Sequence, residues 1–346
     1  VEDTPLALAV AGGLYRPRDY DTRFRGLVGA RTALASSLNV PAVRTLGLVG
    51  GVAFVALLGR LGFAAATESG DYYGPALALG GADVTLAELV AAYRALANGG
   101  IWTPLRVTPS EPIGAPRRVF SPAAAFQVTD VLADRESRSA TFGLESALAT
   151  RFFTAVKTGT SKDMRDNWCV GFSERWTVGV WVGNASGAPM HDVSGVAGAA
   201  PVWLEVMSWL HRAAPSAAPR PPAELVAATV EFPNAVEPTR RDWFARGTEP
   251  AARVLAAGEP RIVTPVDGTI VALDPDIPDD RQRVPLEVAG EAPGVRWQVD
   301  DADLGPARGL TLWAPTSGTH VVRLVAADAT ELATATIEVR GRRRGP

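Results

Sequence analysis

The residues with the clearest chemical potential form one string near the middle of the chain, Lys157-Thr158-Gly159-Thr160-Ser161. This string ends an apolar run that begins near Phe152 and is typical of a β-strand. A lysine ammonium supplies positive charge, two threonine hydroxyls donate hydrogen bonds, and a glycine lets a ligand backbone approach. An N–H group of such a strand can also stabilise a developing oxyanion. The string predicts a carboxylate-binding site; for the Lys-Thr-Gly triplet alone, a polar strand end with a glycine bulge is the alternative.

A second string, Ser36-Ser37-Leu38-Asn39, ends a helix-like stretch that starts at Gly29, and Pro41 follows it. Ser37 and Asn39 could face one cleft from a turn. A serine hydroxyl can relay a proton, and an asparagine amide can both donate to and accept from a substrate amide. The alternative for this string alone is a helix end capped by polar residues.

Helices and strands must position these strings. Thr85 begins a helix with a capping box, since Glu88 follows three residues later, and Ser121-Pro122 opens a second helix. Pro201 opens a third. Between the second and third helices, the residues and short polar turns predict an antiparallel meander, whose strands span 152–160, 167–172 and 176–182. Helices before and after an antiparallel sheet indicate an α+β fold.

The amino-acid composition and the hydrophobic pattern of the chain change after residue 212. Residues 213–224 are rich in Pro and Ala, which predicts a semi-rigid linker, and a poorly patterned segment follows to residue 258. From residue 259 to 341, short alternating strands punctuated by turn residues predict a small all-β immunoglobulin-like sandwich. No catalytic signature occurs in this part, which we interpret as a spacer or recognition module. A chain of 346 residues is also too long for one compact core.

Composition excludes several classes of function. A formal net charge of −3 argues against a nucleic-acid binder. The single cysteine, Cys169, cannot form an internal disulfide, and the three histidines lack ligand spacing, so we expect no metal and no other cofactor. The apolar run from Leu46 to Gly59 is expected to be a loop leading into a buried helix, because a membrane span needs about 20 residues. No signal peptide is visible.

In this order, the two strings resemble the penicillin-binding transpeptidases and serine β-lactamases. Residues 15–26 resemble the Tyr-x-Pro-x-Asn-Tyr-Asp approach of bifunctional class A penicillin-binding proteins, and residues 33–43 resemble their Ala-Leu-x-x-Ser-x-Asn-x-Pro-Ala-Val pattern. Residues 78–93 and 157–172 resemble two further segments of these proteins. The likeness covers about residues 1–210, and the sandwich is similar to the C-terminal domain of the penicillin-binding protein 1C subgroup. The resemblance implies an N-terminally incomplete transpeptidase domain over residues 1–212.

The resemblance also implies a mechanism and roles. A serine acyl-enzyme would form on a peptidoglycan stem peptide ending in D-Ala-D-Ala and pass to an amine, and β-lactams would acylate the same serine. Ser37 would relay a proton to the leaving amine, and Asn39 would hold the substrate amide and the general-base lysine. Lys157 would supply positive charge. Thr158 and Thr160, with Gly159 between them, would bind the terminal carboxylate, and the Thr160 N–H would form half of the oxyanion hole.

One departure from the family is serious. The family nucleophile lies in a Ser-x-x-Lys motif before Ser-x-Asn, but the only lysines are Lys157 and Lys162, and Thr154 and Gly159 precede them by three residues. We therefore expect no nucleophile in this chain, truncation rather than degeneration as the reason, and no activity of the isolated chain. A membrane anchor and a glycosyltransferase are expected upstream, and peptidoglycan would place the working protein on the extracytoplasmic face of the membrane or in the periplasm.

Two other functions stay open. The chain could be a non-catalytic cell-wall binding or scaffold protein with a degenerate transpeptidase fold. It could also be a D,D-carboxypeptidase or β-lactamase, in which water attacks the acyl-enzyme. No residue in the sequence decides between an amine and water as the acceptor.

Overall fold

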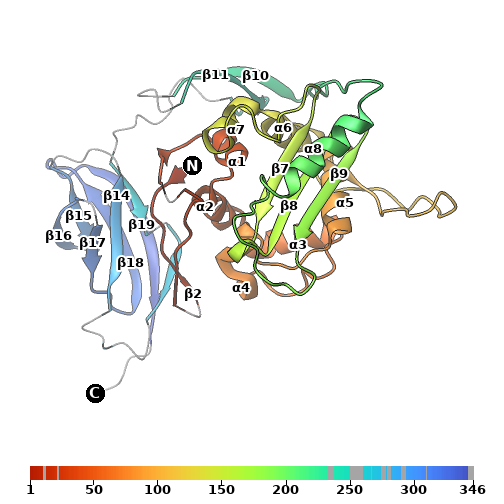
Figure 1. The fold of residues 1–346 in the computed structure, drawn as a ribbon. Coiled ribbons are helices and arrows are strands. Elements are labelled where there is room, and N and C mark those ends of the chain that lie inside the picture. The colour runs from red at the N-terminus through yellow and green to blue at the C-terminus, as the bar shows by residue number, and fades with distance from the viewer. Residues whose placement is uncertain are drawn as a thin grey trace. The chain divides into compact units, whose positions relative to one another are not determined.

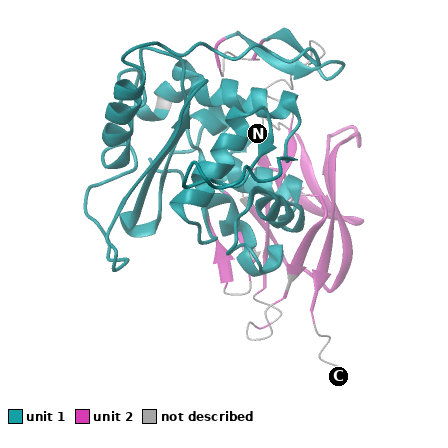
Figure 2. Cartoon of the chain, turned by 90° about the vertical axis from the view of Figure 1, so that its right-hand side faces the viewer, with its two compact units in different colours: residues 1–5, 17–230, 239–250 teal, residues 6–16, 231–238, 251–346 magenta. Residues whose placement is uncertain are grey.

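The computed structural model describes residues 1–10, 13–21, 23–232, 237–249, 260–265, 267–273, 278, 282–289, 294–308 and 310–341. The chain divides into two compact units, shown in Figure 2. Unit 1 comprises residues 1–5, 17–230 and 239–250, and unit 2 comprises residues 6–16, 231–238 and 251–346. Each unit has its own hydrophobic core.

Unit 1 is built on a three-stranded antiparallel meander with helices on both faces (Figure 1). Its strands are β7 (Ala155–Thr160), β8 (Asp166–Phe172) and β9 (Thr177–Gly183), in that order. On one face, Trp203 and Met207 of α8 (Ala199–Leu210) pack against Cys169, and all three are fully buried. The other face carries α5 (Leu86–Ala97) and α6 (Pro122–Ala133). The α+β prediction and the antiparallel meander are confirmed.

The remaining elements of unit 1 are short helices and two-stranded sheets. The helices are α1 (Ala30–Ala35), α2 (Asn39–Val49), α3 (Gly51–Leu61), α4 (Gly70–Tyr73), α7 (Arg135–Phe142) and the 3-10 helices η1 (Gly74–Leu79) and η2 (Lys162–Met164). Antiparallel pairs join β1 (Glu2–Asp3) to β4 (Gly26–Leu27), β5 (Ile101–Trp102) to β6 (Arg117–Arg118), and β10 (Leu225–Val230) to β11 (Arg240–Ala245).

The hairpin of β10 and β11 lies where the sequence predicts only a linker and a poorly patterned segment. Its own sequence is weakly patterned, and tertiary contacts hold it on the helices. The ring of Trp243 packs edge-to-face on Phe126 of α6, with 5.6 Å between ring centroids, and the Trp243 carbonyl accepts a hydrogen bond from Gln127. Asp242 forms an ion pair with Arg31 of α1 (2.6 Å). The expected domain boundaries at residues 212 and 258 stay predictions.

Arg31 is the centre of a buried ion-pair cluster that ties α1 to three other elements. Its guanidinium contacts Asp242 of β11, Asp134 at the start of α7 (3.1 Å) and Asp130 of α6. The side chain of Arg31 is only 7% exposed. Burial opposes its charge, but hydrogen bonds to Asp242 and Asp130 outweigh this effect and raise the pKa of Arg31. Because α1 leads directly into Ser37, this cluster fixes the helix that carries the Ser-x-Asn string.

Unit 2 is a β-structure of two sheets that share one core, together with the hairpin of β2 (Leu8–Val10) and β3 (Gly13–Tyr15). One sheet has the order β12-β14-β17 and the other β13-β19-β18-β15-β16. Trp297, Leu286 and Leu324 are fully buried in the shared core. The strands are β12 (Arg261–Thr264), β13 (Thr269–Ala272), β14 (Val284–Ala289), β15 (Arg296–Val299), β16 (Ala302–Pro306), β17 (Leu310–Trp313), β18 (Gly318–Val325) and β19 (Glu331–Arg340).

The all-β prediction for this region agrees with these sheets. An immunoglobulin-like topology stays a prediction. In unit 1, the expected loop at Leu46 is wrong, because α2 continues through that residue to Val49 and only Gly50 separates it from α3. Within the described residues, no single helix is long and apolar enough to cross a membrane, although α2 and α3, bent by 96°, meet that test as a pair.

Candidate active site

Lys157 and Ser37 meet, although 120 positions separate them in the sequence. The ammonium of Lys157 donates to Ser37 Oγ (2.6 Å) and to the carbonyl oxygen of Thr158 (2.8 Å). Lys157 lies on β7, and Ser37 lies in the turn between α1 and α2. The structure thus brings together one residue from each of the two strings.

The turn gives Ser37 an unusual backbone. Its φ is +59°, in the left-handed region that serine rarely adopts. Backbone hydrogen bonds from Ser37 N–H to Leu34 and from Leu38 N–H to Ala33 close the end of α1. The Ser36 hydroxyl donates to the Ser137 carbonyl of α7 (2.7 Å). These bonds turn the chain so that the Ser37 hydroxyl faces β7.

Asn39 is the first residue of α2 and lies on the other side of the turn. Its side-chain amide donates to the carbonyl oxygen of Arg18 (2.8 Å), and its backbone N–H donates to Asp19 Oδ1. The structure therefore places Asn39 beside the segment that contains Arg18 and Asp19. Its expected contact with a substrate amide stays a prediction.

The far end of β7 presents backbone and hydroxyl groups. The N–H of Ser161 donates across the sheet to Asp166 (2.9 Å). Because neighbouring N–H groups alternate in direction along a strand, the Thr160 N–H points to the opposite edge of β7. No strand of the described residues pairs with that edge. This placement supports the predicted use of the Thr160 N–H as an oxyanion donor.

The three residues after Lys157 differ in their exposure and neighbours. Thr158 is buried, and Thr160 is exposed and accepts a hydrogen bond from the Gly195 N–H (2.9 Å), so its own hydroxyl proton stays free to be donated. A Cβ placed on Gly159 would lie 3.8 Å from the side chain of Trp168, an ordinary contact. Gly195 has far less room, because a Cβ there would come within 2.6 Å of the Gly159 carbonyl. The segment around Gly195 therefore packs directly on this string.

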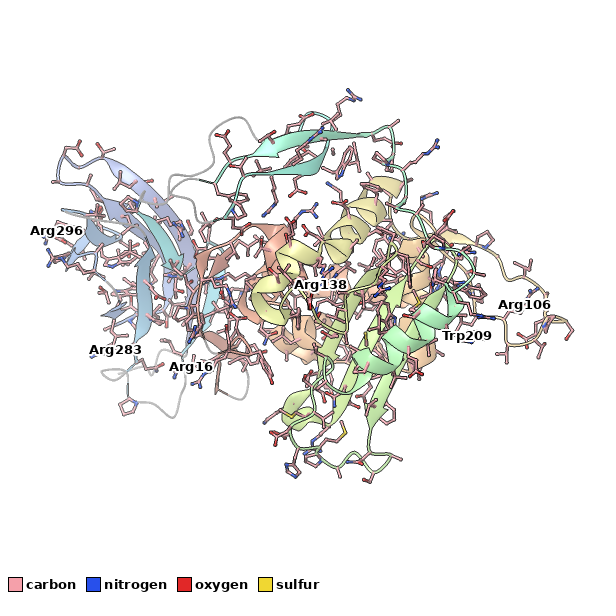
Figure 3. All side chains as sticks on the ribbon, turned by 45° about the horizontal axis from the view of Figure 1, so that its top comes forward. Arg16, Arg106, Arg138, Trp209, Arg283 and Arg296 are labelled. Atoms are coloured by element: carbon pink, nitrogen blue, oxygen red, sulfur yellow. The ribbon has the colours of Figure 1, made fainter. Side chains whose placement is uncertain are left out.

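The site carries positive charge that burial opposes. Burial is the main cause that lowers the pKa of Lys157 to about 8, and repulsion from the Arg138 guanidinium makes a smaller contribution in the same direction. Arg138, labelled in Figure 3, is buried on α7 and donates to the Leu132 carbonyl (2.9 Å). Burial also raises the pKa of Cys169, so its thiol stays neutral at pH 7 and does not offset these charges. Among the described residues, no three His, Cys, Asp or Glu side chains form a metal-binding group.

We expect Lys157 to lose its proton near pH 8, well below the usual range for lysine. Lysine labelled with ¹³C at Cε gives a chain with only two such signals, from Lys157 and Lys162. The variant Lys162→Arg assigns them. A Lys157 signal that titrates above pH 10 would contradict the burial of the ammonium.

Sequence reasoning gave no role to Asp19, Arg138 or Gly195. Asp19 lies in a segment whose resemblance to the family was noted, but nothing in its type or spacing indicates a contact with Asn39. Arg138 is one of many arginines, and only its burial distinguishes it. Gly195 lies in a glycine-rich loop whose approach to β7 depends on the fold.

Family models match both parts of the chain. Residues 9–203 match the model of the penicillin binding protein transpeptidase domain. The chain belongs to the penicillin-binding protein transpeptidase family. Residues 249–330 match the Penicillin-Binding Protein C-terminus Family, so a transpeptidase domain and a penicillin-binding protein C-terminal domain occur in one chain.

Individual penicillin-binding proteins are similar in sequence. Penicillin-binding protein 1C of Escherichia coli (strain K12) is 35% identical over 194 residues, which cover 56% of this chain and 24% of that protein. Penicillin-binding protein 1B of Vibrio cholerae is 30% identical over 224 residues, covering 60% of this chain and 28% of that protein. The chain thus spans about a quarter of the length of these relatives.

A solved structure supports the fold. Penicillin-binding protein 1A from Haemophilus influenzae has a TM-score of 0.61 and 23% identity, over 74% of this chain and 45% of that one. The predicted transpeptidase fold is confirmed by this likeness. The assignments of Ser37, Asn39, Lys157, Thr158, Gly159 and Thr160 to particular roles stay predictions.

Proposed function

We propose that this chain forms the substrate-binding part of a class A, 1C-like peptidoglycan D,D-transpeptidase, which also binds β-lactams. The observation that carries the proposal is the hydrogen bond between Lys157 and Ser37 beside the open edge of β7. A cation and a hydroxyl meet there, and the Thr160 N–H points to the same edge, where no described strand pairs with it, which suits a peptide that ends in a carboxylate.

The proposed reaction is acyl transfer in two steps. A serine hydroxyl attacks the penultimate carbonyl of a stem peptide, and the bond to the terminal D-Ala breaks. Ser37 passes a proton to the departing amine, and the Thr160 N–H stabilises the oxyanion. An amine of a second stem peptide then attacks the ester, gives up its proton and releases the serine.

The carboxylate of the terminal D-Ala binds Thr158, Thr160 and the Lys157 ammonium. Asn39 holds the substrate amide. The attacking serine and its general-base lysine come from a Ser-x-x-Lys segment upstream of Val1, since the printed chain contains no such motif. The same upstream region supplies a glycosyltransferase and an anchor on the extracytoplasmic face of the membrane.

Covalent labelling with a fluorescent penicillin tests the proposal. We expect no labelled band from the 346-residue chain and a strong band when the gene is extended upstream through a Ser-x-x-Lys segment. Excess unlabelled penicillin should suppress that band. Labelling of the chain as printed would show that it holds a nucleophile, and an extended chain without labelling would instead support a scaffold protein.

Product analysis on a pentapeptide substrate separates the hydrolase from the transpeptidase. A cross-linked dimer of stem peptides is the expected product of the extended chain. Tetrapeptide and free D-Ala alone would mean that water is the acceptor.

A further inference from the structure

Two carboxyl groups are buried in unit 1, outside the residues that we assign to the reaction, and one of them contacts the Ser37–Asn39 turn. Asp3 lies on β1 and is 0% exposed, and Asp19, which precedes the turn, is 4% exposed. Aspartate is almost never fully buried unless a charged or hydrogen-bonding partner stabilises it. The pair therefore needs an explanation within unit 1.

Asp19 holds the start of α2. Its Oδ1 accepts hydrogen bonds from the backbone N–H groups of Asn39 and Val40. These are the first two residues of a helix, where N–H groups have no partner within the helix and favour a negative charge. Since Ser37 has a strained backbone two residues earlier, a bond that fixes Asn39 also fixes the direction of the turn.

The other oxygen of each carboxyl is buried and lacks a donor in the described part of the chain. Among the described residues, no N–H or O–H group donates to Asp3 Oδ1 or to Asp19 Oδ2, and both atoms are fully buried. The carboxyl of Asp19 lies close enough to Asp3 to raise the pKa of Asp3. Two neighbouring carboxyl groups can form a hydrogen bond only if one of them carries a proton, because an ionised carboxylate only accepts. One proton between them satisfies both buried atoms.

We propose that Asp3 and Asp19 share one proton and together act as positioning residues, which hold the Ser37–Asn39 turn against Lys157. Asp19 keeps the negative charge at the start of α2, and Asp3 donates to it. Asp3 and Asp19 touch neither the substrate nor the reacting atoms. The catalytic consequence of this pair rests on the function proposed above, but the shared proton and its effect on the turn do not.

The surrounding charges favour this arrangement over two ionised groups. Asp3 Oδ2 accepts from the Arg25 backbone N–H (2.9 Å), and the Arg25 guanidinium lies 3.9 Å away. That guanidinium is also paired with Asp21 (2.9 Å), so it compensates only part of the charge. On the facing helix α2, Arg44 lies 3.9 Å from Glu2.

The pair should respond to pH. Burial and the neighbouring carboxyl of Asp19 raise the pKa of Asp3 from 3.8 to about 7. A folded-state pKa above the ordinary value means that the stabilisation by Asp3 is complete below pH 3.8 and is lost as the pH rises through about 7. Above that pH, the two ionised carboxylates repel one another, and the hydrogen bond from the Asn39 N–H to Asp19 weakens.

Nuclear magnetic resonance tests the pair without any chemistry at the site. In the chain labelled with ¹³C at the aspartate carboxyls and ¹⁵N at the amides, the Asp3 signal and the Asn39 amide signal should shift together, with one midpoint near pH 7. Asp3→Asn should abolish the shift of Asn39, because its amide donates to Asp19 at every pH. Asp71→Asn, a change of an exposed aspartate on α4, should leave the shift intact.

Acylation by penicillin in the upstream-extended chain tests the consequence. Asp19→Ala should slow acylation about 30-fold, since misplacement by about 1 Å can cost 10²-fold, and Asp19→Asn should restore it to within about threefold, because an amide oxygen still accepts from Asn39. In the parent extended chain, the acylation rate should fall as the pH rises through about 7. In Asp3→Asn this fall should be absent, and the rate should change only near pH 8, where Lys157 loses its proton.

The outcomes separate the two proposals. If Asn39 shifts with Asp3 but the parent extended chain is never acylated, the positioning pair stands and the proposed function fails. If the parent is acylated and Asp19→Ala reacts at the parental rate, or if Asn39 does not shift near pH 7, the positioning proposal is overturned. Thermal unfolding of Asp19→Ala and Asp19→Asn checks that both are folded.

Discussion

Lys157→Met should reduce acylation of the upstream-extended chain by penicillin about 10³-fold and, at the same time, stabilise the fold at pH 7. Removing one group that stabilises the charge of an acyl-transfer transition state typically costs 10²- to 10³-fold in rate. Lys157 also contacts Ser37 directly, at 2.6 Å, so the variant loses the partner of the proton relay as well.

The gain in stability follows from the pKa of Lys157. The folded-state pKa of Lys157 is about 8, below the ordinary 10.5. The protonated lysine therefore lowers the free energy of unfolding below pH 8. This cost is relieved as the pH rises from 8 to 10.5. Methionine fills a similar volume without a charge, so Lys157→Met should unfold at a higher temperature at pH 7, and its advantage should shrink towards pH 10.

The sequence offers a matched control, because Lys162 is the only other lysine and is exposed. Lys162→Met should be acylated at the parental rate and should unfold at the parental temperature. Acylation rates come from the growth of the fluorescent band, and unfolding is followed by scanning calorimetry. If Lys157→Met retained a tenth of the parental rate, the assigned role of Lys157 would be wrong.

Arg31→Met should destabilise unit 1 by about 3–5 kcal/mol at pH 7, the typical cost of removing one partner from a buried ion pair. Three carboxylates, Asp130, Asp134 and Asp242, would lose their shared cation. The hairpin of β10 and β11 would also lose its ion pair to α1, so its hydrogen exchange should accelerate.

The effect of Arg31→Met should depend on pH. Burial alone would raise the pKa values of Asp134 and Asp242, but hydrogen bonds and the charge of Arg31 reverse this and lower both. A lowered carboxyl pKa stabilises the fold above the ordinary value of 3.8 and ceases to do so as the pH falls through the lowered pKa. The difference between Arg31→Met and the parent should therefore be large at pH 7 and small near pH 2.

Scanning calorimetry is suited to this test, because the two compact units need not unfold in one transition and the transition of unit 1 can then be followed by itself. Arg106→Met is the control, since Arg106 is exposed on the loop that extends from unit 1 (Figure 3). If Arg31→Met unfolded at the parental temperature at pH 7, the ion-pair cluster around Arg31 would contribute no net stability.

The sequence predicted those elements whose signal is local. Glu88, three residues after Thr85, forms the expected capping box, and the stretches rich in Val, Phe, Trp and Thr that form β8 and β9 pair as an antiparallel meander. The strings around Ser37 and Lys157 were recognisable because several residue types recur at fixed spacing. Their contact follows from the resemblance, since no local pattern relates two residues 120 positions apart.

The unpredicted features depend on tertiary contacts. The hairpin of β10 and β11 has little pattern of its own and is held by Arg31 and Phe126. The bond from Asn39 to Arg18 joins side chain and backbone 21 residues apart, and no residue type demands it. Asp3 and Asp19 look like ordinary polar residues in the sequence, because only the folded chain shows that both are buried.

The backbone of Ser37 also limits how this protein can be engineered. A residue with a side chain costs roughly 1 kcal/mol or more at a φ of +59°, and glycine would relieve that cost. Glycine would also delete the hydroxyl that meets Lys157. A thermostabilisation campaign that ranks substitutions by local conformational energy would therefore select against activity at this position, and Ser37 should be held fixed in any such library.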